Sequence, residues 1–259
     1  MLFVGIDIGA SSTDAVLINE NKDIIAYNVI HTGANHKIAA EKVLEELCEK
    51  SGHGINSIDA IVGTGYGRKN LENITWNITE ITCHAKGTNY FFPSVRTILD
   101  IGGQDSKAIK IDNYGNVTDF IMNEKCAAGT GRYLEAMARV LEVDIKRMGE
   151  LSLLSTQNIQ ISSVCTVFAE SEVISKIAEE KKVEDIINGI HNSVCLRAVA
   201  LLEKIIIEPD IAMTGGVAKN IGIINNLQKM LGFEIKVYKE PQIIGAMGAA
   251  IYALEKSIG

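Results

Sequence analysis

The chain has 259 residues, of which 47% are hydrophobic and 22% are charged, and its formal net charge is −7. This length and composition predict one or two globular domains with a sizeable core. The acidic balance, without a Lys/Arg cluster, argues against nucleic acid as the main partner. No uncharged apolar run approaches the ~18 residues of a membrane helix. The first residues, MLFVGIDIG, do not look like a signal peptide, so the five cysteines are expected to be reduced thiols in the cytoplasm.

The chain begins with an apolar run that ends in Asp-x-Gly, followed by a small polar turn and two further strands. Residues 5–30 read GIDIGASSTDAVLINENKDIIAYNVI, and residues 98–123 read ILDIGGQDSKAIKIDNYGNVTDFIMN. They align without a gap at an offset of 93, which places Asp7 on Asp100 and Gly9 on Gly102. Such a repeat indicates two copies of one supersecondary unit. Two tight loops facing each other across a cleft would hold the phosphates of a nucleotide from both sides.

The loop chemistry supports phosphate binding. Glycine lets the backbone turn sharply and approach a ligand closely, and successive backbone N–H groups form an anion-binding concavity. Asp7 and Asp100 lie at predicted strand ends, where carboxylates can hold Mg²⁺ through its waters. A single turn of this kind is most simply a hairpin without a ligand, whereas the matched pair favours a nucleotide site. The candidate phosphate-binding residues are Gly9, Ala10, Ser11, Ser12, Thr13, Gly102, Gly103, Gln104 and Asp105.

Further along, hydrophobic periodicity and turn signals predict an alternating α/β chain. Strands are expected at 58–62, 210–214 and 234–238, and a Gly-rich turn at 63–67. Helices are expected at 35–50 and 78–91, within 123–142 and 162–180, and at 186–204, with another ending near residue 231. We expect a first domain at 1–95, a second at 96–242, and a last helix at about 243–257 that packs back on the first.

Two late segments are candidates for contact with adenosine. MTGGVAKN (213–220) predicts a strand, a double-Gly turn and a helix start, and PQIIGAMGAA (241–250) predicts a helix with a face of small residues. Close helix–sheet packing would also explain these small residues. The candidate residues are Gly215, Gly216, Val217, Lys219, Asn220, Pro241, Gln242, Ile243 and Gly245. Together with the two phosphate loops, this arrangement resembles the actin, sugar kinase and Hsp70 superfamily. The resemblance implies two duplicated ribonuclease H-like subdomains around a nucleotide cleft.

Two cysteines stand apart from the others. Cys126 and Cys165 are each predicted to lie immediately before, or in the first turn of, an amphipathic helix, where the helix N-terminus favours the thiolate. Cys48 and Cys195 fall on apolar helical faces and are expected in the core, and the position of Cys83 leaves its role open. Iron–sulfur clusters usually take four Cys ligands, so two cysteines would need a two-fold symmetric partner. By spacing alone, buried free cysteines are the simpler interpretation.

Six motifs in chain order favour a metal cluster over buried free cysteines. They are GIDIGASSTDAV, GTGYGR, DIGGQDSK, NEKCAAGTGR, SSVCTVFAESEV and TGGVAKN. Together they resemble the activators of 2-hydroxyacyl-CoA dehydratases and the ATPase subunits of benzoyl-CoA reductases. The resemblance implies a homodimer that binds ATP or ADP with Mg²⁺ and carries one [4Fe-4S] cluster between its subunits, held by Cys126 and Cys165. It also implies an electron taken from a ferredoxin or flavodoxin and delivered, with ATP hydrolysis, to a partner iron–sulfur dehydratase or reductase.

Three other functions stay open at this stage. A small-molecule kinase of the same fold would need a carboxylate base, for which Asp105 is conceivable. A nucleotide-binding redox sensor would use the cluster without delivering electrons. A reductase of a double-cubane-cluster protein would serve small molecules. For hydrolysis, the Gln104 amide is the candidate to orient the attacking water, although it could equally cap its loop.

Overall fold

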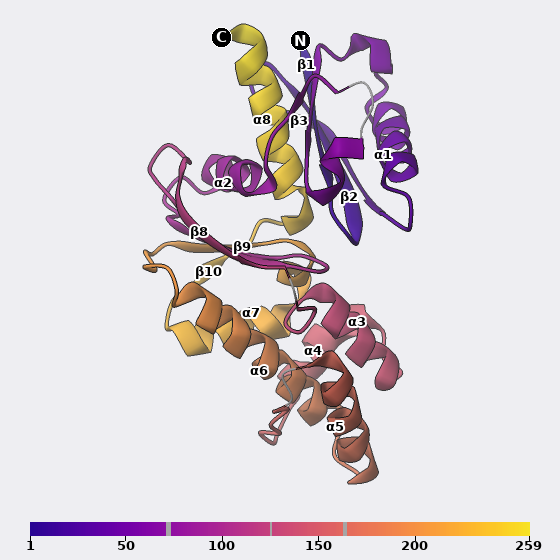
Figure 1. The fold of residues 1–259 in the computed structure, drawn as a ribbon, viewed down its shortest axis with the longest axis vertical. Helices are drawn as coiled ribbons and strands as arrows, with labels where there is room; N and C mark the ends of the chain where they lie inside the picture. The colour runs from indigo at the N-terminus through magenta and orange to yellow at the C-terminus, as the bar shows by residue number, and fades with distance from the viewer. Residues whose placement is uncertain (71–73, 125, 163–164) are drawn as a thin grey trace.

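The computed structural model describes residues 1–70, 74–124, 126–162 and 165–259. Within them the chain forms two five-stranded sheets, stacked one above the other along the molecule (Figure 1), with strand orders β3-β2-β1-β4-β5 and β10-β9-β6-β7-β8. The first sheet contains β1 (Leu2–Ile8), β2 (Ser12–Asn19), β3 (Ile24–His31), β4 (Ala60–Thr64) and β5 (Trp76–Asn77). The second contains β6 (Thr97–Ile101), β7 (Ser106–Ile111), β8 (Val117–Asn123), β9 (Ile211–Thr214) and β10 (Ile235–Lys236).

The internal repeat predicted from the sequence is confirmed down to its irregularities. In both sheets the first three strands form an antiparallel meander, and the first strand pairs in parallel with a later strand. The register shifts between Leu17 and Ile18 in one copy and between Lys110 and Ile111 in the other. These two β-bulges are 93 residues apart, the same offset as the sequence repeat. The two halves are therefore copies of one unit, as expected for the actin and sugar kinase fold.

Eight α-helices surround the sheets in the described part of the chain. They are α1 (His36–Ser51), α2 (Glu80–Phe91), α3 (Gly131–Val140), α4 (Met148–Leu153), α5 (Thr166–Ala178), α6 (Val183–Leu202), α7 (Ile221–Leu231) and α8 (Ile244–Ile258). Short 3₁₀ turns lie at Ile55–Ser57, Tyr66–Asn70, Ile145–Arg147, Gly216–Lys219 and Pro241–Ile243. None of these helices is long and apolar enough to cross a membrane.

Local signals explain most helix ends. The Asn35 side chain caps α1 by accepting from Lys37 N and Ile38 N, and Gly52 ends the helix in the left-handed region at φ 71°. The strand expected at 58–62 is shifted to Ala60–Thr64, because the backbone N–H of Ile58 is used in a turn with the Ile55 carbonyl, at 3.2 Å. The short helix α4 was not predicted, because its six residues are too few to show helical periodicity.

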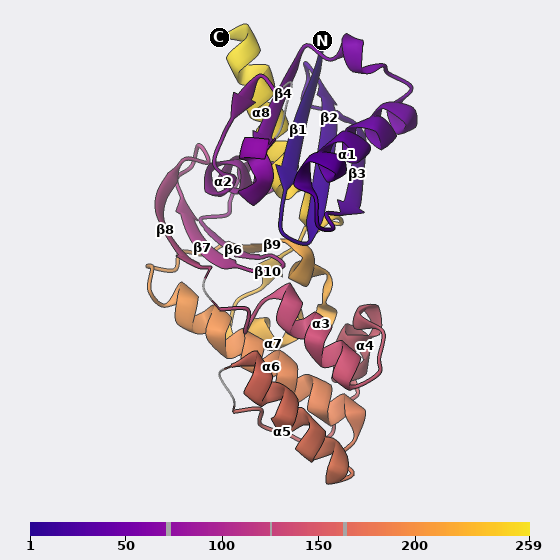
Figure 2. The ribbon, with the colours of Figure 1, turned by 45° about the vertical axis from the view of Figure 1, so that its right-hand side comes forward.

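The small residues of α8 let it pack directly on backbone. A Cβ on Gly5 of β1 would lie 1.9 Å from the Ala246 carbonyl, and a Cβ on Gly248 would lie 1.8 Å from the Cys83 carbonyl of α2. The C-terminal helix is thus wedged between the first sheet and α2 (Figure 2), in one core cluster with Phe3. Close packing accounts for this stripe of small residues without a ligand.

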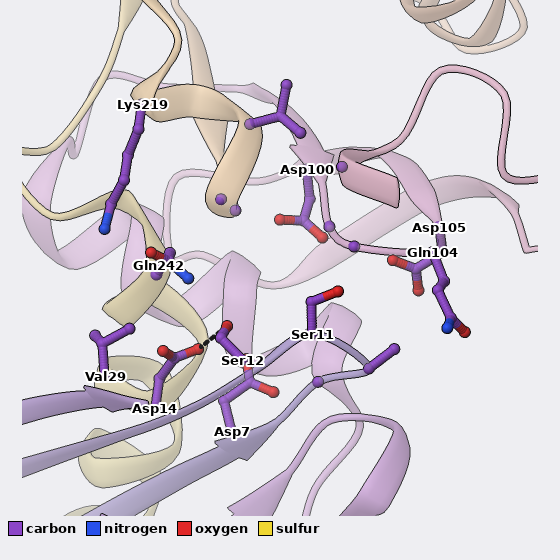
Figure 3. Close-up of a pocket in the computed structure, with 18 of the residues that line it drawn as sticks. Asp7, Ser11, Ser12, Asp14, Val29, Asp100, Gln104, Asp105, Lys219 and Gln242 are labelled. Carbon is purple, nitrogen blue, oxygen red and sulfur yellow. Dashed lines mark hydrogen bonds between the residues drawn. The ribbon is translucent and has the colours of Figure 1, made fainter. Parts of the chain in front are cut away.

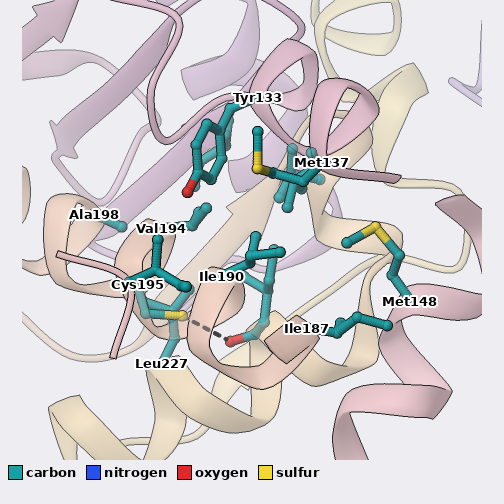
Figure 4. Packing of buried hydrophobic residues seen from close by; sticks show 14 of the residues in the cluster. Tyr133, Met137, Met148, Ile187, Ile190, Val194, Cys195, Ala198 and Leu227 are labelled. Atoms are coloured by element: carbon teal, nitrogen blue, oxygen red, sulfur yellow. Dashed lines mark hydrogen bonds between the residues drawn. The ribbon is translucent and has the colours of Figure 1, made fainter. Parts of the chain in front are cut away.

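The larger core lies under the second sheet, where α3, α4, α6 and α7 meet (Figure 4). Tyr133, Met137 and Cys195 are fully buried there, and the Cys195 thiol lies 3.5 Å from the Ile223 carbonyl. Burial raises the pKa of Cys195 to about 12, so this thiol is a core residue as predicted. Cys48 is only half-buried on α1.

Candidate active site

A cavity of about 970 Å³ opens between the two sheets and is walled by both repeated loops (Figure 3). It brings together most of the residues selected from the sequence, although these come from four distant segments. The predicted residues that line it are Asp7, Gly9, Ala10, Ser11, Ser12, Asp100, Gly102, Gly103, Gln104, Asp105, Gly215, Gly216, Val217, Lys219, Asn220 and Gln242. The Gln104 side chain is exposed at the edge of the cavity.

Four predicted contact residues do not line the cavity. The Thr13 hydroxyl is buried and lies 3.0 Å from the Thr32 hydroxyl, and Ile243 belongs to the core. The Pro241 carbonyl accepts from the backbone N–H of Gly215. Gly245 lies behind Asp7, where a Cβ would come within 2.0 Å of Asp7 Oδ2. These residues support the cavity wall from outside.

Both loops close in the same way. The Gly9 N–H donates to the Ser12 carbonyl at 2.9 Å, and the Gly102 N–H donates to the Asp105 carbonyl at 3.0 Å. Each turn thereby folds back within four residues at the end of a buried strand. The loops present their backbone to the cavity from opposite sheets, which is the arrangement predicted for clamping phosphates.

The second loop is also the anchor of helix α3. The N–H groups of Gly131 and Arg132 donate to the carbonyls of Gly102 and Gly103, both at 2.9 Å. Gly103 in turn lies against the first loop, since a Cβ there would be 2.1 Å from Ser11 Oγ. A displacement of the second loop therefore moves the start of α3 with it.

A buried charge cluster, which the sequence did not reveal, lies at the floor of the cavity. Lys107 Nζ is within 3.1 Å of Asp100 Oδ2, 2.8 Å of Asp105 Oδ2 and 3.5 Å of Glu80 Oε1. Burial opposes the charge on Lys107, but the three acidic partners outweigh it and raise its pKa. Burial also opposes the charge on Asp100, whose pKa is nevertheless lowered to about 2 by His84 and Lys107.

His84 of α2 connects the two sheets at this point. Its Nε2 lies 3.5 Å from Asp7 Oδ2 of the first sheet, and its Nδ1 lies 3.6 Å from Asp100 Oδ1 and 3.2 Å from Thr214 Oγ1 of the second. Burial alone would lower the pKa of His84, but the carboxylates of Asp100 and Asp7 raise it to about 9. A lone His in an ambiguous helical segment gives no sequence signal for such a bridge.

This bridge predicts a specific pH dependence of stability. The pKa of His84 is raised to about 9 in the folded protein, whereas it is near 6.5 in the unfolded chain. The charged His84 therefore stabilises the folded protein fully below about pH 6.5, and this contribution is lost as the pH rises through 9. The His84→Gln protein, which cannot be charged, should lack this loss, which we expect to be on the order of 1–3 kcal/mol. Urea unfolding of both proteins at pH 6 and pH 10 measures it. Equal pH dependence in the two proteins would contradict the bridge.

Asp14 is a further acidic residue in the cavity wall that was not selected from the sequence, because it reads there as an ordinary strand position. It is only 4% exposed. Its Oδ2 accepts from the Ser12 hydroxyl at 3.0 Å, whereas its Oδ1 has no hydrogen-bond partner (Figure 3). Burial, and next the nearby Asp7 carboxylate, raise the pKa of Asp14 well above its usual range.

The two cysteines selected from the sequence lie outside the cavity. Cys165 directly precedes α5, as predicted, and is exposed. For Cys126 the prediction was wrong, because α3 begins only at Gly131, after a turn in which Thr130 N donates to the Ala127 carbonyl at 3.0 Å. The neighbouring motif residues 125, 163 and 164 lie outside the described residues.

The remaining cysteines differ in environment. Cys83 is buried on α2, and burial raises its pKa to about 12. Cys126 is half-buried, and the Cys165 thiol makes no capping hydrogen bond to its helix. Within the described part of the chain, no three His, Cys, Asp or Glu side chains gather in an arrangement that could hold a metal ion.

The duplicated sheets and the two glycine loops across the cleft define a nucleotide-binding protein of the actin and sugar kinase fold. A ROK family glucokinase from Streptomyces griseus shares this fold, with a TM-score of 0.59 and 12% identity over 98% of this chain and 100% of the glucokinase. Residues 4–253 match the BadF/BadG/BcrA/BcrD ATPase family, and the chain belongs to that family.

Two relatives are similar over almost their whole length. The activator of lactoyl-CoA dehydratase from Anaerotignum propionicum is 46% identical over 255 residues, which cover 98% of each chain. The structure of the activator of the 2-hydroxyisocaproyl-CoA dehydratase from Clostridium difficile, with bound ADPNP, superimposes with a TM-score of 0.96 and 44% identity. That likeness covers 100% of this chain and 96% of the activator. The predicted family resemblance is thus confirmed.

Proposed function

We propose that this ATPase is a low-potential electron donor that activates a partner iron–sulfur enzyme. One observation carries the proposal: the loop expected to bind phosphate and the segment that holds Cys126 are joined through the start of α3. Gly131 and Arg132 are bonded to the second loop, and Cys126 lies five residues before Gly131. A change in the nucleotide therefore has a short mechanical route to this cysteine.

The nucleotide would lie in the cavity between the sheets. The backbone of residues 9–12 and 102–104 would bind the phosphates, and the turn at Gly215 and Gly216 would lie against adenosine. Gly215 adopts φ 83°, and a Cβ there would be 2.4 Å from the Ile101 carbonyl, so the turn requires glycine. Mg²⁺ would neutralise charge on the phosphates, with Asp7 and Asp100 as the acidic residues selected from the sequence to face it. Gln104, at the cavity edge, is the proposed residue that orients the attacking water.

Cys126 and Cys165 are the proposed ligands of a [4Fe-4S] cluster. They are the cysteines with accessible thiols that follow the second repeat, whereas Cys83 and Cys195 are buried in the two halves of the molecule. A Cys₄ cluster needs four thiolates, and two-fold symmetric dimers are the commonest assembly. A homodimer would therefore supply two cysteines from each subunit. The bound cluster would hold a single electron at low potential.

The partner enzyme is proposed from the relatives. Activators of lactoyl-CoA and 2-hydroxyisocaproyl-CoA dehydratases are 46% and 44% identical to this chain, which favours a 2-hydroxyacyl-CoA dehydratase or a benzoyl-CoA reductase-like protein as the electron acceptor. A ferredoxin or flavodoxin would reduce the cluster. The alternative electron acceptor is a double-cubane-cluster protein that acts on small molecules.

Coupling between the two sites is tested by redox titration. Because binding linkage is reciprocal, exchanging ADP for ATP should shift the potential of the cluster in anaerobically prepared dimer. A shift of ~59 mV corresponds to a tenfold change for a one-electron couple, so a modest effect is measurable. Identical potentials and identical chelator sensitivity with ADP and with ATP would contradict the coupling.

A further inference from the structure

The two copies of the repeat differ in charge at one position of the cavity wall. The offset of 93 that aligns Asp7 with Asp100 also aligns Asp14 with Lys107. The strand registers agree, because Asp7 pairs with Asp14 across β1 and β2, and Asp100 pairs with Lys107 across β6 and β7. One copy therefore carries an Asp–Lys pair, and the other carries an Asp–Asp pair.

The charge of the second copy is already balanced. Asp100 Oδ2 receives Lys107 Nζ at 3.1 Å, and its Oδ1 accepts from the Thr214 hydroxyl at 2.8 Å, with His84 at 3.6 Å. Both carboxylate oxygens are thus occupied by protein groups. A cation that approached Asp100 would have to displace Lys107 or compete with its charge.

The first copy is balanced only at Asp7, whose Oδ2 lies 3.5 Å from His84 Nε2. Asp14 lines the cavity but is only 4% exposed, and its Oδ1, which has almost no exposed surface, lacks a hydrogen-bond partner. Two cationic groups of the same cavity bind other acids: Lys219 Nζ pairs with Glu240 at 2.7 Å, and the His84 ring is shared between Asp7, at 3.5 Å, and Asp100, at 3.6 Å. An unpartnered buried carboxylate oxygen beside a second acid is costly without a further positive group.

We infer that Asp14 faces the divalent cation of the nucleotide together with Asp7, and that Asp100, held by Lys107, is the lesser carboxylate contact. Mg²⁺ is usually held by one or two carboxylates, substrate phosphates and its own waters, and waters of the cation would donate to the orphan Asp14 Oδ1. The phosphate-binding loop 9–12 lies between these two acids in the sequence, so cation and phosphates would meet at one place. This inference rests on the proposed nucleotide site and specifies its metal side.

The test compares Asp14→Asn with the unaltered dimer in calorimetric titrations of ADP, with Mg²⁺ and with EDTA. The variant should bind ADP at least tenfold more weakly with Mg²⁺, and should bind it equally or more tightly with EDTA because a negative charge is gone. Asp119→Asn, an equal change of charge at an exposed position of β8, should behave like the unaltered protein. An Asp14→Asn protein that keeps the full Mg²⁺ effect overturns the inference.

A second substitution tests the same idea in the opposite direction. Asp14→Lys gives the first copy the charge pair of the second and should make ADP binding largely independent of Mg²⁺, with an unchanged or higher unfolding temperature. A normal Mg²⁺ effect on ADP binding to the Asp14→Lys protein overturns the inference. The inference also fails if Asp14→Lys does not bind ADP while Asp14→Asn binds it with the normal Mg²⁺ effect. If the unaltered protein shows no Mg²⁺-dependent nucleotide binding, the proposed site itself fails, which separates the two outcomes.

Discussion

Replacing either Cys126 or Cys165 by Ser should remove the iron from the protein. Anaerobically purified protein is expected to contain about two irons per chain, since a four-iron cluster with Cys₄ ligation would be shared by two subunits. Serine is a poor ligand for iron–sulfur clusters compared with the thiolate, so each variant should lose the visible absorbance of the cluster completely. Iron analysis measures the metal content of each variant, and sedimentation measures its oligomeric state.

The matched control is Cys48→Ser, because this half-buried cysteine lies on α1 of the other half of the molecule. It should keep its iron and its absorbance. Iron retained in both the Cys126 and Cys165 variants, or four irons in each monomer, would refute a cluster shared through these residues.

Gly245→Ala should nearly abolish ATP hydrolysis, although it adds one methyl group outside the cavity. That methyl would lie 2.0 Å from Asp7 Oδ2 and 2.9 Å from His84 Nε2, so the Asp7 carboxylate must move. A displacement of about 1 Å at a reacting site can cost about 10²-fold in rate, and overpacking costs about 1–3 kcal/mol of stability. Steady-state hydrolysis and thermal unfolding measure the two effects.

Gly54→Ala is the control for this substitution. Gly54 has φ −74°, and a Cβ there would meet nothing within 4 Å, so hydrolysis and stability should be unchanged. A Gly245→Ala protein that hydrolyses ATP at the normal rate would show that Asp7 does not need its present position.

The duplicated hairpins could be predicted from the sequence because they are local. Each loop and its flanking strands lie within 26 residues, and the two copies confirm each other at a fixed offset. The charge cluster could not be predicted in this way. Glu80, His84 and Lys107 meet only because α2 is packed between α8 and the second sheet. Glu80 and His84 stand in no motif, and the motif that ends at Lys107 does not indicate its partners.

Two features near the site differ from the simplest sequence-based expectation for physical reasons as well. The stripe of small residues on α8 suggested contact with adenosine, but close packing on β1 and α2 uses these residues. Cys126 was placed at a helix start, yet the turn that ends at Thr130 delays α3 until Gly131. Helical periodicity locates the body of a helix well and its first turn poorly.

The most direct test of the proposed function is electron delivery in three nucleotide states. Dithionite-reduced protein is mixed anaerobically with a candidate 2-hydroxyacyl-CoA dehydratase, and reduction of the dehydratase is followed with ATP, with ADP and with a non-hydrolysable ATP analogue. An ATP-driven donor should sustain electron transfer with ATP alone. Equal delivery in all three states would contradict it and would favour a nucleotide-binding redox sensor.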